Sequence, residues 1–188
     1  MKTFNRFIIE RLRLNDQSKI NLHKKFHPKN FDELQNLIKQ LLEERGPNAD
    51  MNDIDISSVT SFWNEDTRWG LFENLDPHNI DISKWDVSNV TSMRHMFSNC
   101  CNFNCNLSQW NVRKVKDMNF MFNNCEKFDC NLSQWDVRNV EDMCYMFSCC
   151  INFKGQGLEK WKPIKCEDMY EMFDECESLK NKPNWYWE

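Results

Sequence analysis

Residues 107–125 read LSQWNVRKVKDMNFMFNNC, and residues 132–150 repeat the pattern 25 residues later as LSQWDVRNVEDMCYMFSCC. The pattern occurs four times, with tryptophan anchors at Trp85, Trp110, Trp135 and Trp161. A methionine follows each anchor after eight residues, and a Met-Phe pair and a cysteine come next. A fixed period of this length is the signature of repeat architectures, in which stacked units bury a core that one unit cannot bury alone.

The repeats divide residues 51–188 into five units. A degenerate unit, residues 51–84, carries an insertion within residues 63–70. The clear units are residues 85–109, 110–134 and 135–160, and the terminal unit is residues 161–188. The unit at 135–160 is one residue longer than the others, and Gly155 and Gly157 supply flexible backbone for a bulge there.

Each unit predicts one short helix and one short strand. Met118, Met121, Phe122 and Cys125 follow the i, i+3, i+4, i+7 spacing of a helical stripe about three turns long. Residues 128–137 are richer in strand-compatible residues and are bounded by Asn and Asp. The expected fold class is therefore an α/β repeat solenoid, with units in the size range of leucine-rich repeats.

Residues 1–50 form a separate N-terminal helical region. Residues 4–12 suggest one amphipathic helix, and the apolar residues from Phe31 to Leu42 predict a second. Asn30 with Glu33 resembles a capping box, and Gly46-Pro47 is a helix stop. The region carries ten Lys/Arg and seven Asp/Glu, a net charge of +3, whereas the remainder has 14 against 22, a net charge of −8. We interpret it as a cap on the first repeat; a docking helix for a partner is the alternative.

The termini and composition favour a cytoplasmic protein. The first residues contain charges where a signal peptide needs an apolar run, and no stretch approaches the roughly 18 apolar residues of a membrane span. We expect the chain to act in the cytoplasm, of a host if it is a phage or viral protein. A cell-surface location is the alternative if a leader has been removed.

Residues 107–125 and 132–150 closely resemble the BspA-type leucine-rich-repeat family, whose units read roughly Leu-Ser-x-Trp-Asp-Val…Met-x-x-Met-Phe-x-x-Cys. The resemblance covers about 130 residues, and seven residue types recur at fixed spacing. It implies a non-enzymatic binding protein, since many members are bacterial surface proteins and large viral genomes also encode them. The chain lacks the secretion signal and lipobox of an adhesin. More weakly, residues 4–12 are similar to the openings of phage proteins from gut bacteria.

Three functions follow from these observations. The first is an intracellular protein-protein interaction module, and one form of this function is a phage- or virus-encoded inhibitor of a host defence protein. The second is a bacterial surface adhesion protein whose leader is absent. The third is an acidic mimic of nucleic acid; the −8 charge of the repeats argues against direct binding to a phosphate backbone. We expect another protein as the partner, and the sequence does not indicate an oligomeric state.

The sequence predicts no enzyme, metal or cofactor site. Its four histidines lie in unrelated settings, and no phosphate loop, nucleophile elbow or zinc-binding pattern appears. The recurring Asp117, Asp142 and Asp168 are interpreted as N-terminal helix caps. The cysteines are expected to be reduced, and the four repeat anchors Cys100, Cys125, Cys150 and Cys176 are interpreted as packing residues. Cys105 and Cys130, one repeat apart, could pair only if their segments lie side by side.

The candidate binding residues are those that vary while the repeat frame stays constant. Two residues precede each Met-Phe pair and differ from repeat to repeat. They are Arg94-His95, Asn119-Phe120, Cys144-Tyr145 and Tyr170-Glu171. Aromatic residues at such positions form a stripe, and Tyr, Trp and Arg are typical of binding hot spots. The alternative is that they widen the packed face. The protein-binding candidates are Arg94, His95, Phe120, Tyr145, Tyr170, Trp63, Trp69, Trp185 and Trp187.

Overall fold

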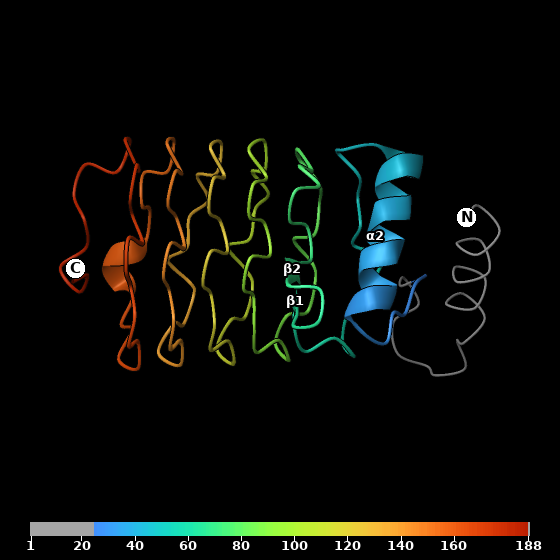
Figure 1. Ribbon diagram of the computed structural model, residues 1–188, viewed down its shortest axis with the longest axis horizontal. Helices are drawn as coiled ribbons and strands as arrows, with labels where there is room; N and C mark the ends of the chain where they lie inside the picture. Colours follow the sequence, from blue (N-terminus) through green and yellow to red (C-terminus); the bar gives the residue numbers. More distant parts are fainter. Residues whose placement is uncertain (1–24, 188) are drawn as a thin grey trace.

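The computed structural model describes residues 25–187, which form a row of coils stacked side by side along the long axis of the molecule (Figure 1). A single helix lies across one end of the row, and the C-terminal segment lies at the other end. The helix expected over residues 4–12 lies outside the described residues.

Helix α2 spans Phe31–Arg45, which confirms the second helix expected from the sequence. Its backbone begins with the Glu33 N–H donating to the Asn30 side chain, and it ends where the Gly46 N–H donates to the Leu42 carbonyl. The Glu33 carboxylate accepts from the Lys29 N–H at 3.0 Å, one residue before the position that a standard capping box uses. Its buried residues are Leu34, Leu37, Ile38 and Leu41, and they belong to the same core as the coils.

The repeat units contain neither the expected helices nor the expected strands. Residues 118–125 form overlapping turns, and residues 128–137 are irregular with a turn at Ser133–Gln134. The Met121 N–H donates to the Met118 carbonyl and the Cys125 N–H to the Phe122 carbonyl, so the bonds close turns of four residues. Phe120 and Asn124 both have positive φ, which turns the chain out of a right-handed helix every fourth residue. The helical spacing of the apolar residues is therefore produced by turns.

Neighbouring coils are joined by backbone hydrogen bonds at a constant offset. The N–H groups of Met118, Phe120, Phe122 and Asn124 donate at 2.8–2.9 Å to carbonyls of the next coil. Single parallel bridges join Ser61 to Ser92 and then continue through Asp117, Asp142 and Asp168. The insertion forms its own antiparallel hairpin, with strand β1 (Trp63–Asn64) paired to strand β2 (Trp69–Gly70).

The core is a set of side-chain columns that run along the stack. Phe97, Phe122, Phe147 and Phe173 stack with ring centroids 5.6–5.8 Å apart. The indole N–H of each anchor tryptophan donates to a carbonyl of the preceding coil, as Trp135 does to Leu107 at 3.0 Å. The anchor cysteines do the same through sulfur, as Cys125 does to the Phe97 carbonyl at 3.0 Å. The repeated residues thus satisfy polar atoms as well as filling volume.

The longer unit differs from its neighbours at a 3₁₀ turn, η1 (Leu158–Lys160). Gly157 precedes it with φ of 90°, and a Cβ there would lie 2.3 Å from the Ser133 backbone nitrogen. The glycine therefore allows the additional residue to fit against the preceding coil.

Replacing Gly70 by alanine should destabilise the protein by about 2–4 kcal/mol, because the new Cβ would lie 2.0 Å from the His95 carbonyl oxygen, a backbone atom. Gly46→Ala is the matched control: its φ is +80°, but no atom lies within 4 Å of the new Cβ. Its φ of 80° and ψ of 179° lie in a region that only glycine adopts readily, so the substitution should cost about 1–3 kcal/mol through backbone strain alone. Equilibrium urea unfolding checks both values, and a loss below about 1 kcal/mol for Gly70→Ala would contradict the close approach of the hairpin to the coil.

Candidate protein-binding face

Five side chains form a continuous aromatic row along one side of the stack: Trp63, His95, Phe120, Tyr145 and Tyr170. Trp63 stacks on His95 with centroids 5.1 Å apart, His95 on Phe120 at 4.7 Å, and Phe120 on Tyr145 at 4.6 Å. Tyr145 meets Tyr170 edge to face at 5.5 Å. These separations match the spacing of adjacent chains in a hydrogen-bonded stack, so each coil adds one ring to the row.

The three central rings occupy an unusual backbone position. His95, Phe120 and Tyr145 have φ of 51°, 55° and 53°. Each is the third residue of a turn closed by a Met N–H, as in Met121 to Met118. A positive φ at that position normally requires Gly or Asn, and a bulky residue there is strained. The aromatic rings are held where a smaller residue would fit with less strain.

The aromatic row differs from the other aromatic columns in its exposure. Phe103, Phe128 and Phe153 form a column in the core and are 0% exposed. The rings from Trp63 to Tyr145 are half-buried, and Tyr170 is 58% exposed. A stack that served only the core would have no solvent edge, whereas this one presents a rigid apolar surface.

A cleft of about 680 Å³ lies at the Trp63 end of the aromatic row. The Arg94 guanidinium lies 5.1 Å from the centroid of the Trp63 ring, a cation–π contact. The guanidinium is also 3.9 Å from a carboxylate oxygen of Asp117, a loose ion pair. The cleft is lined by Ser61, Trp63, Glu65, Arg68, Ser92, Arg94, His95 and Asp117.

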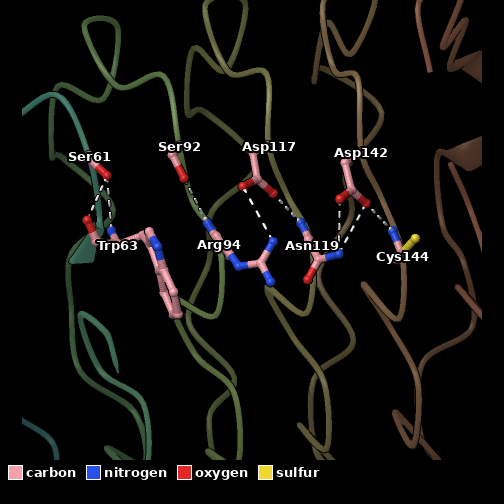
Figure 2. A network of polar contacts seen from close by, with 8 residues as sticks. All are labelled: Ser61, Trp63, Ser92, Arg94, Asp117, Asn119, Asp142 and Cys144. Carbon is pink, nitrogen blue, oxygen red and sulfur yellow. Dashed lines mark hydrogen bonds and ion pairs between the residues drawn. The ribbon is translucent and has the colours of Figure 1, made fainter. Parts of the chain in front are cut away.

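Beside the aromatic row runs a polar row, Ser61, Ser92, Asp117, Asp142 and Asp168, which the parallel bridges join (Figure 2). Each member accepts the backbone N–H two residues later, as Asp142 does from Cys144 at 2.8 Å. The Asn119 side chain also reaches across to the next coil and donates to Asp142 at 3.0 Å. Asp117, Asp142 and Asp168 therefore cap turns and join coils; their interpretation as helix caps was wrong because no helix follows them.

The acids of the polar row differ in environment. Burial raises the pKa of Asp117 above its ordinary value, although the hydrogen bond from the Asn119 N–H opposes that shift. The pKa of Asp168 is lowered by hydrogen bonds from the Cys144 thiol and the Tyr170 N–H. Of these two acids, Asp117, which lies near Arg94, is the one whose ionised form is disfavoured.

The remaining candidates lie away from the aromatic row. Trp69 is in strand β2 and is 46% exposed. Trp185 is half-buried, stacks on Trp161 and donates to the Leu158 carbonyl at 2.7 Å, so it continues the structural tryptophan column. Trp187 is 50% exposed in the C-terminal segment. The structure gathers Trp63, Arg94, His95, Phe120, Tyr145 and Tyr170 at one face and leaves Trp69, Trp185 and Trp187 outside the row.

Two parts of the surface were missed by the sequence reasoning. Ser61, Ser92 and Arg68 line the cleft. The register of Ser61 and Ser92 with the aspartates of later repeats could have indicated these two, whereas Arg68 lies in the insertion and has no counterpart. A second cleft of about 600 Å³ is basic, and its lining includes Arg113, Lys114, Lys116 and Lys165. These cations come from two units that are not adjacent, residues 110–134 and 161–188, so a linear charge count does not reveal the cleft.

The structure also describes the cysteines and possible metal ligands. All ten cysteines are free thiols, including Cys105 and Cys130. Burial raises the pKa of Cys105 to about 11, which disfavours its reactive thiolate form. Within residues 25–187 no group of three or more His, Cys, Asp or Glu side chains is placed to hold a metal ion. No helix in that part of the chain has the length and apolar character to cross a bilayer.

Asp117→Asn should stabilise the protein at neutral pH. Because the folded-state pKa of Asp117 is raised, this carboxyl favours folding most below its unfolded pKa of 3.8, and the benefit is lost as pH rises through the folded value. The difference in Tm between the variant and the parent should change in favour of the variant by about 1–3 °C as the pH rises from about 3 to about 7. Thermal unfolding followed by circular dichroism measures the difference.

Asp136→Asn is the control of opposite sign. Hydrogen bonds from Arg138 lower the pKa of Asp136 to about 2, so its stabilising contribution is present above pH 3.8 and disappears as pH falls through about 2. This variant should lose stability at pH 7. The same pH trend in both variants would contradict the assignment of Asp117.

Comparison with known proteins identifies the family of the chain. No curated protein matches it, and no solved structure does. The model of a family described as "Mycoplasma protein of unknown function, DUF285" matches residues 67–187, which are 121 of the 188 residues. The matched segment includes the three clear units, the terminal unit up to residue 187 and strand β2. The chain therefore belongs to the DUF285 family.

Proposed function

We propose that this protein is a non-enzymatic protein-protein interaction module that binds its partner through the aromatic row. The observation that carries the proposal is the solvent-facing stack of Trp63, His95, Phe120, Tyr145 and Tyr170. Three of its members hold a strained positive φ. The same φ recurs at Cys149 and Glu171, so the repeating turns of the stack enforce it and fix the place of each ring.

The aromatic row has the physical properties of a binding hot spot. Trp, Tyr and Arg are enriched among the residues that dominate binding energy, and Arg94 lies against the Trp63 ring at one end of the row. Each ring is fixed by stacking and by a hydrogen-bonded coil beneath it. A partner would therefore bind a surface that loses little side-chain freedom on association.

The dimensions of the row favour a linear contact. Five rings at a spacing of about 4.8 Å extend over about 20 Å, the length of a short strand or loop of a partner. The polar row takes one residue from each of the same coils, joined by parallel bridges, and offers carboxylates at Asp142 and Asp168. Apolar contacts along the rings, flanked by polar ones, reproduce the usual arrangement of a specific interface.

The family relationship is compatible with this proposal but does not carry it. The family has no assigned function. The finer resemblance to BspA-type leucine-rich repeats, whose members bind other proteins, supports a binding role. The residues that would set the partner are those of the aromatic row, since the Trp, Met, Phe and Cys columns are occupied in packing.

Replacing both Phe120 and Tyr145 by asparagine should abolish partner binding while leaving the fold intact. Asparagine tolerates positive φ, so these substitutions remove the rings without adding backbone strain. Tagged protein from a bacterial lysate should recover one stoichiometric protein that the double variant no longer recovers. Circular dichroism and urea unfolding establish that the variant is folded.

The matched control is Gln109→Ala with Gln134→Ala, a pair that is exposed and also one repeat apart. This variant should retain the partner. Equal recovery by the parent, the asparagine variant and the control would exclude the aromatic row as the binding face.

A further inference from the structure

The backbone of each clear repeat presents four N–H groups in one direction along the stack. In the coil of Trp85 they belong to Met93, His95, Phe97 and Asn99, and in each later coil to the residues at the same repeat positions. At the three interfaces between the four clear coils, all of these groups donate at 2.8–3.0 Å to carbonyls of the following coil. The acceptors in the next coil are likewise alternate residues, such as Asp117, Asn119, Met121 and Asn123.

The equivalent groups of the last coil are the N–H groups of Met169, Glu171, Phe173 and Glu175. Within residues 25–187 none of the four has a hydrogen-bond acceptor. The segment that follows does pack on this end, since Trp185 stacks on Trp161 and Tyr186 meets Phe173 edge to face. It supplies the side chains of the next tryptophan column but no carbonyl to the four donors. Unpaired backbone groups at such an edge are a template for another chain.

The surroundings of these donors are strongly acidic. Residues 167–177 contain six acids and no Lys or Arg, a net charge of −6. Asp168, Asp174 and Glu175 are exposed, and Glu171 is half-buried. An anion would be repelled by these carboxylates, whereas a chain that offers neutral carbonyls and positive side chains complements both features.

We propose that the N–H row of residues 169, 171, 173 and 175 receives a basic segment of a partner protein whose alternate carbonyls face the row, as those of the following coil do within the stack. Two copies of this chain cannot pair here through their rows, because both rows consist of donors. The opposite end is not available either, since α2 packs across it and the Gln35 side chain donates to the Gly70 carbonyl at 3.4 Å. The surface adjoins the aromatic row only at Tyr170, and the substitutions at Phe120 and Tyr145 test that row separately, so failure of one proposal can be told from failure of the other.

Amide hydrogen exchange followed by NMR tests the proposal directly. The probe is a fluorescein-labelled peptide of about eight residues that alternates lysine and threonine, long enough to reach all four donors. Its addition to the full chain should slow the exchange of the four amides by about ten-fold. The amides of Met143, Tyr145, Phe147 and Cys149 already donate to the next coil and serve as internal controls. Their exchange should not change.

Charge variants identify the source of the affinity. Asp174→Asn with Glu175→Gln should weaken binding of the lysine peptide about five- to ten-fold in fluorescence anisotropy. Glu43→Gln with Glu44→Gln, on the exposed side of α2, should leave it unchanged. Binding without amide protection, or equal binding of a glutamate-threonine peptide, would overturn the proposal. Protection that appears with rising protein concentration in the absence of peptide would assign the edge to a second copy and would also overturn it.

Discussion

The structure depends on one constraint: each coil must place its backbone donors opposite the carbonyls of the next coil. At each interface between the four clear coils, the same four repeat positions meet this requirement at 2.8–3.0 Å. A buried backbone group without a partner is costly, so the register cannot drift by a residue without loss at every position. The fixed spacing of the repeats in the sequence is the consequence, and the side-chain columns follow from it.

The side chains use the spacing in two different ways. In the core, Phe, Trp and Cys columns fill volume and satisfy carbonyls of the preceding coil. On the outer side, the same spacing stacks His95, Phe120 and Tyr145 at 4.6–4.7 Å, but these residues keep a positive φ. Stability does not require an aromatic ring at that position, because Asn124 adopts a similar φ in the next turn of the same unit. The contrast separates the residues that build the stack from those available for binding.

The sequence predicted some features well and others wrongly, for physical reasons. Helix α2 was predictable because its apolar spacing and its cap are local signals. The spacing from Met118 to Cys125 was misleading, because turns with positive φ every fourth residue give the same apolar pattern as a helix. No glycine marks these positions in residues 118–125, so the usual signal of a left-handed conformation is missing.

The candidate face was also only partly predictable. Comparison of the repeats indicated His95, Phe120 and Tyr145, which occupy one repeat position. Trp63 joins them from an insertion, and Tyr170 joins from the adjacent position, so no alignment places them in the same row. The cleft beside Arg94 depends on Asp117 from another coil.

The hydrogen bonds between coils run in both directions, and this has a consequence for how such a chain can change. Backbone N–H groups reach forward to the next coil, whereas the indole and thiol groups of Trp135 and Cys125 reach back to the preceding one. Adding or removing a whole repeat would therefore retain every ladder. A change of one residue retains the ladders only where a turn absorbs it, as the turn at Gly157 does.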